Sequence, residues 1–355
     1  MPILLHAADL HLDSPFSGLS PEKAVQRRKE QRQLLARLTE LVHRNHVELV
    51  LLSGDILDGS AVYADTAEAL CRALAQMAVP VFLAPGNHDP APIYDAIPLP
   101  ENVTLFREET VTSVPLPHLH CTVHGRGLAS SAPIPFASLG FSAPQDGQTH
   151  LLCLHGDVNG SVLRHGPIPE EALAASRVTY AALGHIHAYS GLRRSDSVTW
   201  AYPGCPEGRG FDETGEKGVL LGSVEPDKVD LTFVPTALRR YHDLTVPLSG
   251  TASPEEAVLA ALPEHCEEDV VRLTLTGEIE APDLSALTAL CEERCFSALL
   301  RDRTSLPRDL LARAGEDSLA GYFLRTLQSY DGQPEYEQAL RFGLAALENR
   351  EEPCP

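Results

Sequence analysis

The chain is best understood from one segment, Val79-Pro80-Val81-Phe82-Leu83-Ala84-Pro85-Gly86-Asn87-His88-Asp89-Pro90. Its apolar start, bounded by proline and glycine, is typical of a buried strand in a parallel sheet. Asn87, His88 and Asp89 follow at the carboxyl end of that strand, where open α/β sheets bind their ligands. A plain Asx turn would explain these three residues equally well. The choice between a binding site and a turn therefore depends on the rest of the chain.

The overall composition is that of a globular protein with about two domains. The chain has 355 residues, of which 43% are hydrophobic and 22% charged. No apolar run approaches the ~18 residues of a membrane span, and the N-terminus lacks a secretory pattern. We therefore expect a cytoplasmic protein, with no membrane association. The eight cysteines include no C-x-x-C pair, so we interpret them as buried thiols.

The distribution of charge bears on possible partners. The formal net charge of −21 argues against a protein that holds nucleic acid by bulk electrostatics. Seven of the basic residues nevertheless gather between positions 23 and 44 and outnumber the acidic ones there. They form either a solvated helix face or a surface that contacts phosphates.

Four more apolar runs end in a polar cluster of the same kind. Residues 3–8 are followed by Asp9 and His11, and residues 47–52 by Asp55 and Asp58. Residues 150–154 are followed by His155, and residues 178–183 by His185 and His187. Residues two apart face the same side of an extended chain, so each D-x-H or H-x-H pair is expected to converge. Helical patterns at 21–42 and 63–77 separate the first strands, which predicts a parallel sheet covered on both faces.

These clusters, together with the first one, supply seven candidate metal ligands: Asp9, His11, Asp55, Asn87, His155, His185 and His187. Carboxylate, amide and imidazole ligands without a thiolate suit manganese, iron or zinc. Seven side chains exceed the needs of one ion, but with one bridging carboxylate they can hold two divalent ions ~3.5–4 Å apart. Such a pair attracts phosphate and activates water, so the predicted reaction is hydrolysis of a phosphate ester.

A second histidine group, His118, His120 and His124 around Cys121, lies in what the pattern predicts to be a proline-bounded strand. No further histidine or cysteine pair has the spacing of a zinc site. We therefore expect these histidines to be structural.

The five blocks together resemble a known family. Asp9-x-His11, Gly54-Asp55-x-x-Asp58, Gly86-Asn87-His88-Asp89, His155-Gly156-Asp157 and Gly184-His185-x-His187 resemble, in this order, the motifs of the calcineurin-like metallophosphoesterases. The resemblance covers about residues 1–235 and implies a layered sandwich of β-sheets flanked by helices. It implies one metal on Asp9, His11, Asp55 and His187, and the other on Asp55, Asn87, His155 and His185. It also implies that His88 is the general acid and that Asp89 orients it.

A finer resemblance is to the SbcD-type DNA double-strand-break repair nucleases, in particular the bacterial YhaO-like branch. Residues 9–16, 202–209 and 215–218 carry it. It implies a manganese-dependent DNA 3'-5' exonuclease and endonuclease, which is a homodimer and works with an SbcC-like coiled-coil ATPase. The alternative is a metallophosphoesterase that acts on nucleotides or other small phosphodiesters and phosphomonoesters.

The glycine-rich block from 202 to 218 contains two candidate contacts to substrate phosphate, Arg209 and Lys217. Salt bridges to Glu207 or Glu213 within the loop would explain the presence of these two cations equally well.

The expected domains are a nuclease domain over 1–236, a smaller α+β capping domain over 237–306 and a C-terminal helical segment over 307–355. Two amphipathic helices are expected in the last segment, at 318–330 and 335–349. Their apolar faces either complete a core or dock on the helices of the ATPase.

Overall fold

The computed structural model describes residues 2–59, 62–128, 133–251, 253–279, 282–333 and 335–347. The chain divides into two compact units, Met1–Leu238 and Arg239–Pro355, so the division lies two residues beyond the expected boundary. Within the described ranges, no helix is long and apolar enough to span a membrane.

The first unit contains a sheet with the strand order β12–β11–β1–β2–β3–β4. Its strands are β1 (Ile3–Ala7), β2 (Leu49–Leu52), β3 (Val81–Leu83), β4 (Val103–Leu105), β11 (Gly218–Glu225) and β12 (Lys228–Pro235). Strands β1 to β4 run parallel, as the alternation of apolar runs and helical patterns predicts. The hairpin β11–β12 pairs antiparallel with β1 and extends the sheet at that side.

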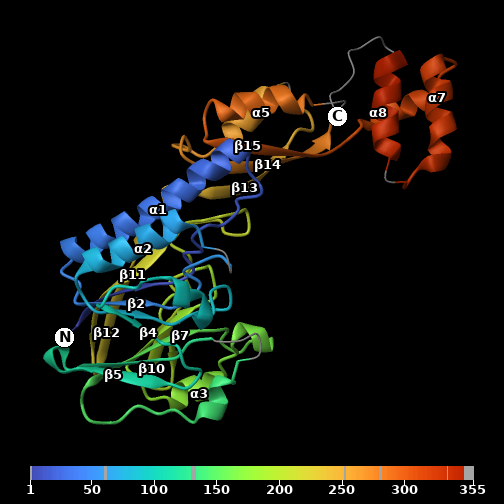
Figure 1. The fold of residues 1–355 in the computed structure, drawn as a ribbon. Helices are drawn as coiled ribbons and strands as arrows, with labels where there is room; N and C mark the ends of the chain where they lie inside the picture. The colour runs from blue at the N-terminus through green and yellow to red at the C-terminus, as the bar shows by residue number, and fades with distance from the viewer. Residues whose placement is uncertain are drawn as a thin grey trace. The chain divides into compact units, whose positions relative to one another are not determined.

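Two helices cover one face of this sheet, α1 (Pro21–Arg44) and α2 (Ala64–Met77) (Figure 1). Helix α1 begins as predicted, because the Ser20 side chain accepts a hydrogen bond from the Lys23 amide and Pro21 occupies the first helical position. Its apolar side, which includes Leu34 and Leu38, packs on buried residues of β1, β2 and β3. This burial drives the helices onto the sheet.

The other face of the first sheet is covered by a second sheet, with the order β5–β6–β7–β8–β10–β9. Its strands are β5 (Thr112–Leu116), β6 (Cys121–Gly125), β7 (Thr149–His155), β8 (Tyr180–Gly184), β9 (Arg193–Ser195) and β10 (Val198–Ala201). Helix α3 (Glu170–Ala175) packs its Leu173 on the outer face of this sheet. The unit is thus the layered sandwich that the resemblance implied, with helices outside two central sheets.

Short 3-10 turns connect several elements: η1 (Ala91–Ala96), η2 (Pro117–Leu119), η3 (Phe136–Leu139), η4 (Leu163–His165), η5 (Arg313–Gly315) and η6 (Gln328–Tyr330). The turn η2 corrects one expectation, because the segment around His118 is not part of a strand. His120 adopts a left-handed conformation (φ 49°) and β6 begins only at Cys121. His118 and His120 are exposed, whereas His124 is buried and hydrogen-bonded to Ser113 and His150.

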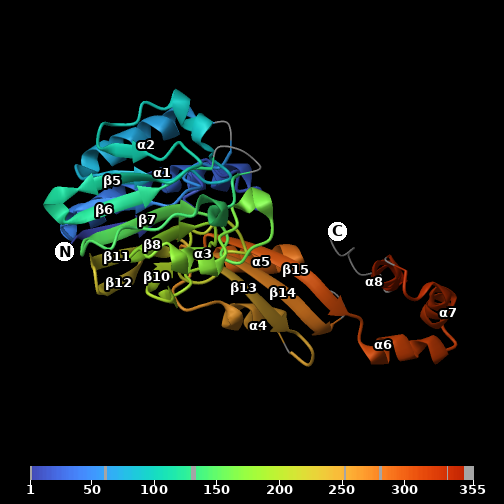
Figure 2. The ribbon, with the colours of Figure 1, turned by 90° about the horizontal axis from the view of Figure 1, so that it is seen from below.

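The second unit contains a three-stranded parallel sheet, β13–β14–β15. Its strands β13 (Tyr241–Pro247), β14 (Val270–Glu278) and β15 (Ser297–Ser305) alternate with helices α4 (Pro254–Ala261) and α5 (Leu284–Glu292). Figure 2 shows α4 and α5 beside this sheet, and they share one apolar core with it. The unit is therefore of the parallel α/β type, not the expected α+β type, because a third strand follows α5.

Three helices follow this sheet: α6 (Arg308–Ala312), α7 (Leu319–Leu327) and α8 (Tyr336–Leu347). Leu310, Leu324, Leu340 and Leu344 form a small core among them. The predicted apolar faces of α7 and α8 therefore pack on each other, while Leu319 remains 70% exposed. The expected end of the last helix, at residue 349, lies outside the described residues. The seven described cysteines are free thiols, and Cys354 also lies outside this part of the chain.

The basic residues of α1 mostly form ion pairs. Arg27 is fully buried and its guanidinium contacts Glu207 at 2.8 Å. Arg37 contacts the same carboxylate at 2.9 Å, and Arg44 pairs with Glu40 at 3.3 Å. These contacts favour a structural role for most of this basic cluster. They also tie α1 to the loop that follows residue 202.

We predict that Arg27→Ala lowers the free energy of unfolding of the first unit by about 3 kcal/mol, because it removes a buried cation from the carboxylate of Glu207. Urea unfolding followed by the fluorescence of Trp200, the single tryptophan of the chain, reports on this unit alone. Arg44→Ala removes an exposed pair with Glu40 on the same helix and is expected to change stability little. Equal stability of the two variants would contradict the prediction.

Candidate metal centre

The predicted ligands lie on loops that follow five strands of the two sheets. Asp9, Asp55 and Asn87 follow β1, β2 and β3, whose parallel pairing places their carboxyl ends together. Hydrogen bonds join these loops to those of the second sheet. The His155 Nδ1 lies 2.9 Å from the carbonyl oxygen of Ser53, and the His185 amide donates to Asp9 Oδ1 at 3.0 Å. The strand ends of both sheets therefore meet at one site.

The backbone at this site is unusually strained. Asp9 (φ 54°), His11 (φ 43°), Asp55 (φ 52°) and His185 (φ 116°) all have positive φ. A non-glycine residue in this region costs about 1–3 kcal/mol and persists where the surroundings enforce it. The extended geometry assumed from the sequence is therefore wrong for Asp9 and His11. Left-handed turns bring their side chains together.

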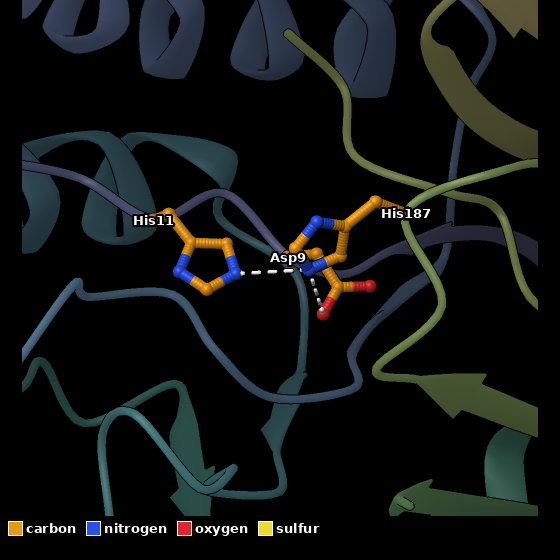
Figure 3. Close-up of side chains that lie close together, drawn as sticks. All are labelled: Asp9, His11 and His187. Atoms are coloured by element: carbon orange, nitrogen blue, oxygen red, sulfur yellow. Dashed lines mark hydrogen bonds and ion pairs between the residues drawn. The ribbon is translucent and has the colours of Figure 1, made fainter. Parts of the chain in front are cut away.

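Asp9, His11 and His187 form the first cluster, with one ligand atom of each within 4.8 Å of the others. Figure 3 shows the three side chains gathered at one point, with Asp9 and His11 on one loop and His187 on another. The Nε2 atoms of His11 and His187 are 3.2 Å apart, and Asp9 Oδ1 lies 3.9 Å from His187 Nε2. This cluster joins the loops after β1 and β8.

Asp55, His155 and His185 form the second cluster, again within 4.8 Å. His185 and His187 thus separate, contrary to the expected convergence of the pair. The Asn87 Oδ1 lies 3.0 Å from His155 Nε2. Asp55 Oδ2 lies 3.4 Å from His155 Nε2 and 3.7 Å from His11 Nε2, between the two clusters. All seven predicted ligands therefore gather at one site, with Asp55 in the bridging position.

The hydrogen bonds of the histidines indicate which ring nitrogens are available to bind cations. His155 Nδ1 faces the Ser53 carbonyl oxygen, His11 Nδ1 faces Asp58 at 3.2 Å, and His187 Nδ1 faces Glu213 at 2.7 Å. The Ser53 carbonyl and the Asp58 carboxylate only accept, so the Nδ1 of His155 and that of His11 carry the proton, and each neutral ring turns its Nε2 lone pair inward. The Nδ1 of His187 lies between Glu213 and the Nη2 of Arg209, which is 3.1 Å away.

Burial favours the neutral form of three imidazoles at the site. It lowers the pKa of His11 and that of His185 to about 4, and it also lowers the pKa of His155. The inward lone pairs of His11 and His155 then face the carboxylate of Asp55, with no proton between them. Ligand atoms that repel one another in this way are stabilised when divalent cations bind between them.

The buried carboxylates differ in their environments. Burial, and next the negative charge of Asp55, raise the pKa of Asp9. Burial alone would raise the pKa of Asp55 as well, but His155, His11 and the His88 amide outweigh it and the net shift is downward. Two carboxylates this close destabilise each other unless a cation lies nearby.

His88 lies at the accessible side of the site. Its imidazole is 47% exposed and its Nδ1 contacts Asp58 Oδ1 at 3.0 Å. The hydrogen bond to Asp58 raises the pKa of His88. Asp58 also contacts His11 and accepts from the Ser14 hydroxyl at 2.7 Å. Asp58 is therefore the carboxylate that orients His88.

Asp89, which was expected to orient His88, contacts other groups. Its oxygens accept hydrogen bonds from the backbone amides of residues 55, 56, 57 and 86 and from the Tyr94 hydroxyl. Burial raises the pKa of Asp89 to about 7. Asp89 thus holds together the two loops that carry Asp55 and Asn87.

The two predicted phosphate contacts have partners inside the protein. Arg209 Nη2 contacts Glu213 at 2.6 Å, so the salt bridge considered for this residue is present. Lys217 is only 4% exposed and donates to the His187 carbonyl oxygen at 2.8 Å. Glu213 contacts both Arg209 and His187, a role that the sequence did not reveal because 26 residues separate it from the histidine.

The comparisons with known proteins agree with this site. Residues 3–189, more than half of the chain, match the family model described as calcineurin-like phosphoesterase. The chain belongs to the calcineurin-like phosphoesterase family. It is thus a phosphoesterase by family, with candidate groups for divalent metal ions.

Several similar proteins were found at low identity, including the following three. YhaO of Bacillus subtilis, an uncharacterised metallophosphoesterase, is 29% identical over 77% of this chain and 68% of that protein. The DNA double-strand break repair protein Mre11 of Saccharolobus solfataricus is 23% identical over 87% of this chain and 84% of that protein. The SbcD component of the nuclease SbcCD of Rhodobacter capsulatus is 25% identical over 73% of this chain and 75% of that protein.

We predict that the protein binds two manganese ions, measured by equilibrium dialysis and metal analysis. His187→Ala and His155→Ala are each expected to leave one tightly bound ion, because each removes a ligand from a different cluster. Asp55→Ala is expected to lose both, since its carboxylate lies between the clusters. His118→Ala, at an exposed turn, is the control. A wild-type stoichiometry of one would contradict the prediction.

We also predict that Glu213→Ala weakens binding of one of the two ions by about 10- to 100-fold, because Glu213 fixes the His187 ring. Titration with manganese would show one weakened and one unchanged site. Asp212→Ala, at the exposed neighbouring acid, is expected to bind like wild type. Equal affinities for the Glu213 and Asp212 variants would show that the carboxylate does not position the ligand.

Proposed function

We propose that the protein is a manganese-dependent DNA nuclease that hydrolyses phosphodiester bonds as a 3'-5' exonuclease and endonuclease. The observation that carries this proposal is the position of His88, whose exposed imidazole contacts Asp58 beside the two clusters, with Asp55 between them. The names of the Mre11 and SbcD relatives support DNA as the substrate.

The chain's own groups have separate tasks in this reaction. Two divalent cations at the clusters would neutralise phosphate charge and activate a water nucleophile. Asp55 holds both clusters together, and the amide of His88 donates to its Oδ1 at 2.8 Å. Protonated His88 donates its proton to the departing oxygen, and Asp58 favours that protonated form. The exposed side of His88 is where substrate enters.

The proposal includes partners. An SbcC-like coiled-coil ATPase and a homodimeric assembly are proposed by analogy with the SbcCD nuclease relative. Within the C-terminal helices, α7 exposes Leu319 and Tyr322, at 70% and 64%, on the side away from its own core. These side chains are the proposed contact with the ATPase.

The substrate is tested with end-labelled linear DNA, incubated with manganese, magnesium or a chelator, with and without an SbcC-like ATPase. Hydrolysis with manganese, abolished by the chelator and by Asp55→Ala, is the expected result. The alternative function, hydrolysis of nucleotides or other small phosphate esters, is favoured by the low identity to the Mre11 and SbcD relatives and by the name of YhaO, which specifies only a metallophosphoesterase. Activity on a small diester with none on DNA in any condition would establish that alternative.

We predict that His88→Ala lowers the rate of DNA hydrolysis by about 10²- to 10⁴-fold while two ions remain bound, because the departing sugar oxygen needs a proton. With bis(p-nitrophenyl) phosphate the loss is expected to be much smaller, since nitrophenolate is a stable leaving group. The control is again His118→Ala. An equal loss on both substrates would argue against His88 as the general acid.

A further inference from the structure

The loop between β7 and α3, residues 156–169, lies beside the second metal cluster and is firmly held at its base. The Gly156 amide donates to the Gly184 carbonyl at 3.0 Å, and the Ile168 amide donates to Asp157 at 2.9 Å. The Tyr202 hydroxyl donates to the Gly156 carbonyl at 2.8 Å and accepts from Val158 at 2.9 Å. The loop is thus fixed to the strands that lead to His155 and His185.

The tip of this loop brings a histidine and an arginine next to the site. The ring of His165 lies 4.8 Å from that of His185, measured between centroids. The Arg164 Nε donates to His165 Nε2 at 3.2 Å. Because this Nε2 accepts, a neutral His165 carries its proton on Nδ1 and can donate it to a ligand.

Arg164 differs from the other cations near the site. Arg209 is held by Glu213, and Lys217 is buried on a carbonyl oxygen. Arg164 is exposed, and within the described part of the chain no carboxylate forms an ion pair with it. A guanidinium has five N–H donors, of which His165 occupies one. The remaining donors match the geometry of a phosphate group.

We propose that Arg164 and His165 form a subsite for a second phosphate, the one next to the scissile phosphate of a polynucleotide. The inference rests on the proposed function, because a single phosphodiester has no such neighbour. The subsite adds affinity for long substrates without contacting the reacting phosphate. It therefore selects polynucleotides over the small esters of the alternative function.

The test compares two substrates in the presence of manganese. For a linear DNA oligonucleotide, Arg164→Ala is expected to raise KM at least about tenfold, the effect of a hydrogen bond to a charged group, with kcat nearly unchanged. For bis(p-nitrophenyl) phosphate, which has one phosphate, both constants are expected to stay at wild-type values. The salt dependence of DNA binding is expected to lose about one unit of slope. Arg164→Lys should recover part of the affinity.

Arg194→Ala is the matched control, because Arg194 is exposed and pairs with Thr199 at the start of β10, at the opposite end from the site. The subsite is overturned if wild type cleaves DNA and Arg164→Ala has the same KM and salt slope as Arg194→Ala. It is also overturned if Arg164→Ala loses activity equally on both substrates, which would indicate a structural effect. Wild-type protein that never hydrolyses DNA refutes the proposed function itself, so the two failures are distinguishable.

Discussion

The site depends on the hydrogen bonds that fix the outer nitrogens of three histidines. His11, His155 and His187 face acceptors with their Nδ1 atoms, and each acceptor comes from another segment of the chain. The inner lone pairs of His11 and His155 are thereby held against the carboxylate of Asp55. In the absence of a cation this arrangement is repulsive, and the strained backbone at Asp55 adds to its cost. The rest of the first unit supplies the rigidity that maintains it.

That rigidity comes from the packing of two sheets. The apolar layer between them is continuous and includes Leu51 and Phe82 from one sheet and Cys153 and Ala182 from the other. Just above this layer, Asp89 accepts hydrogen bonds from two loops of the first sheet, and Ser53 contacts His155 of the second. Each cluster takes ligands from both sheets, so the contact between the sheets keeps the ligands of each cluster together.

The arrangement separates three tasks that a phosphoesterase must perform. Buried carboxylates and neutral histidines provide ligands for cations, while His88 keeps a raised pKa at the accessible side because Asp58 is its partner. Arg209 forms a salt bridge with Glu213 inside the protein. In our proposal, the exposed Arg164 on the loop after β7 supplies the contact to substrate phosphate that Arg209 does not.

The sequence alone predicted the strands β1, β2, β3, β7 and β8, the helices α1 and α2, and the seven candidate ligands, because apolar runs and the polar residues after them are local features. The sequence did not reveal that a second sheet packs on one face of the first sheet. A strand that is buried on both faces has the same apolar pattern whether helices or another sheet pack on it. The contact of His88 with Asp58 and that of Glu213 with His187 join residues that are distant in the chain. Only the tertiary structure decided these contacts, because hydrogen bonds form between groups that the fold brings together, whatever their separation in sequence.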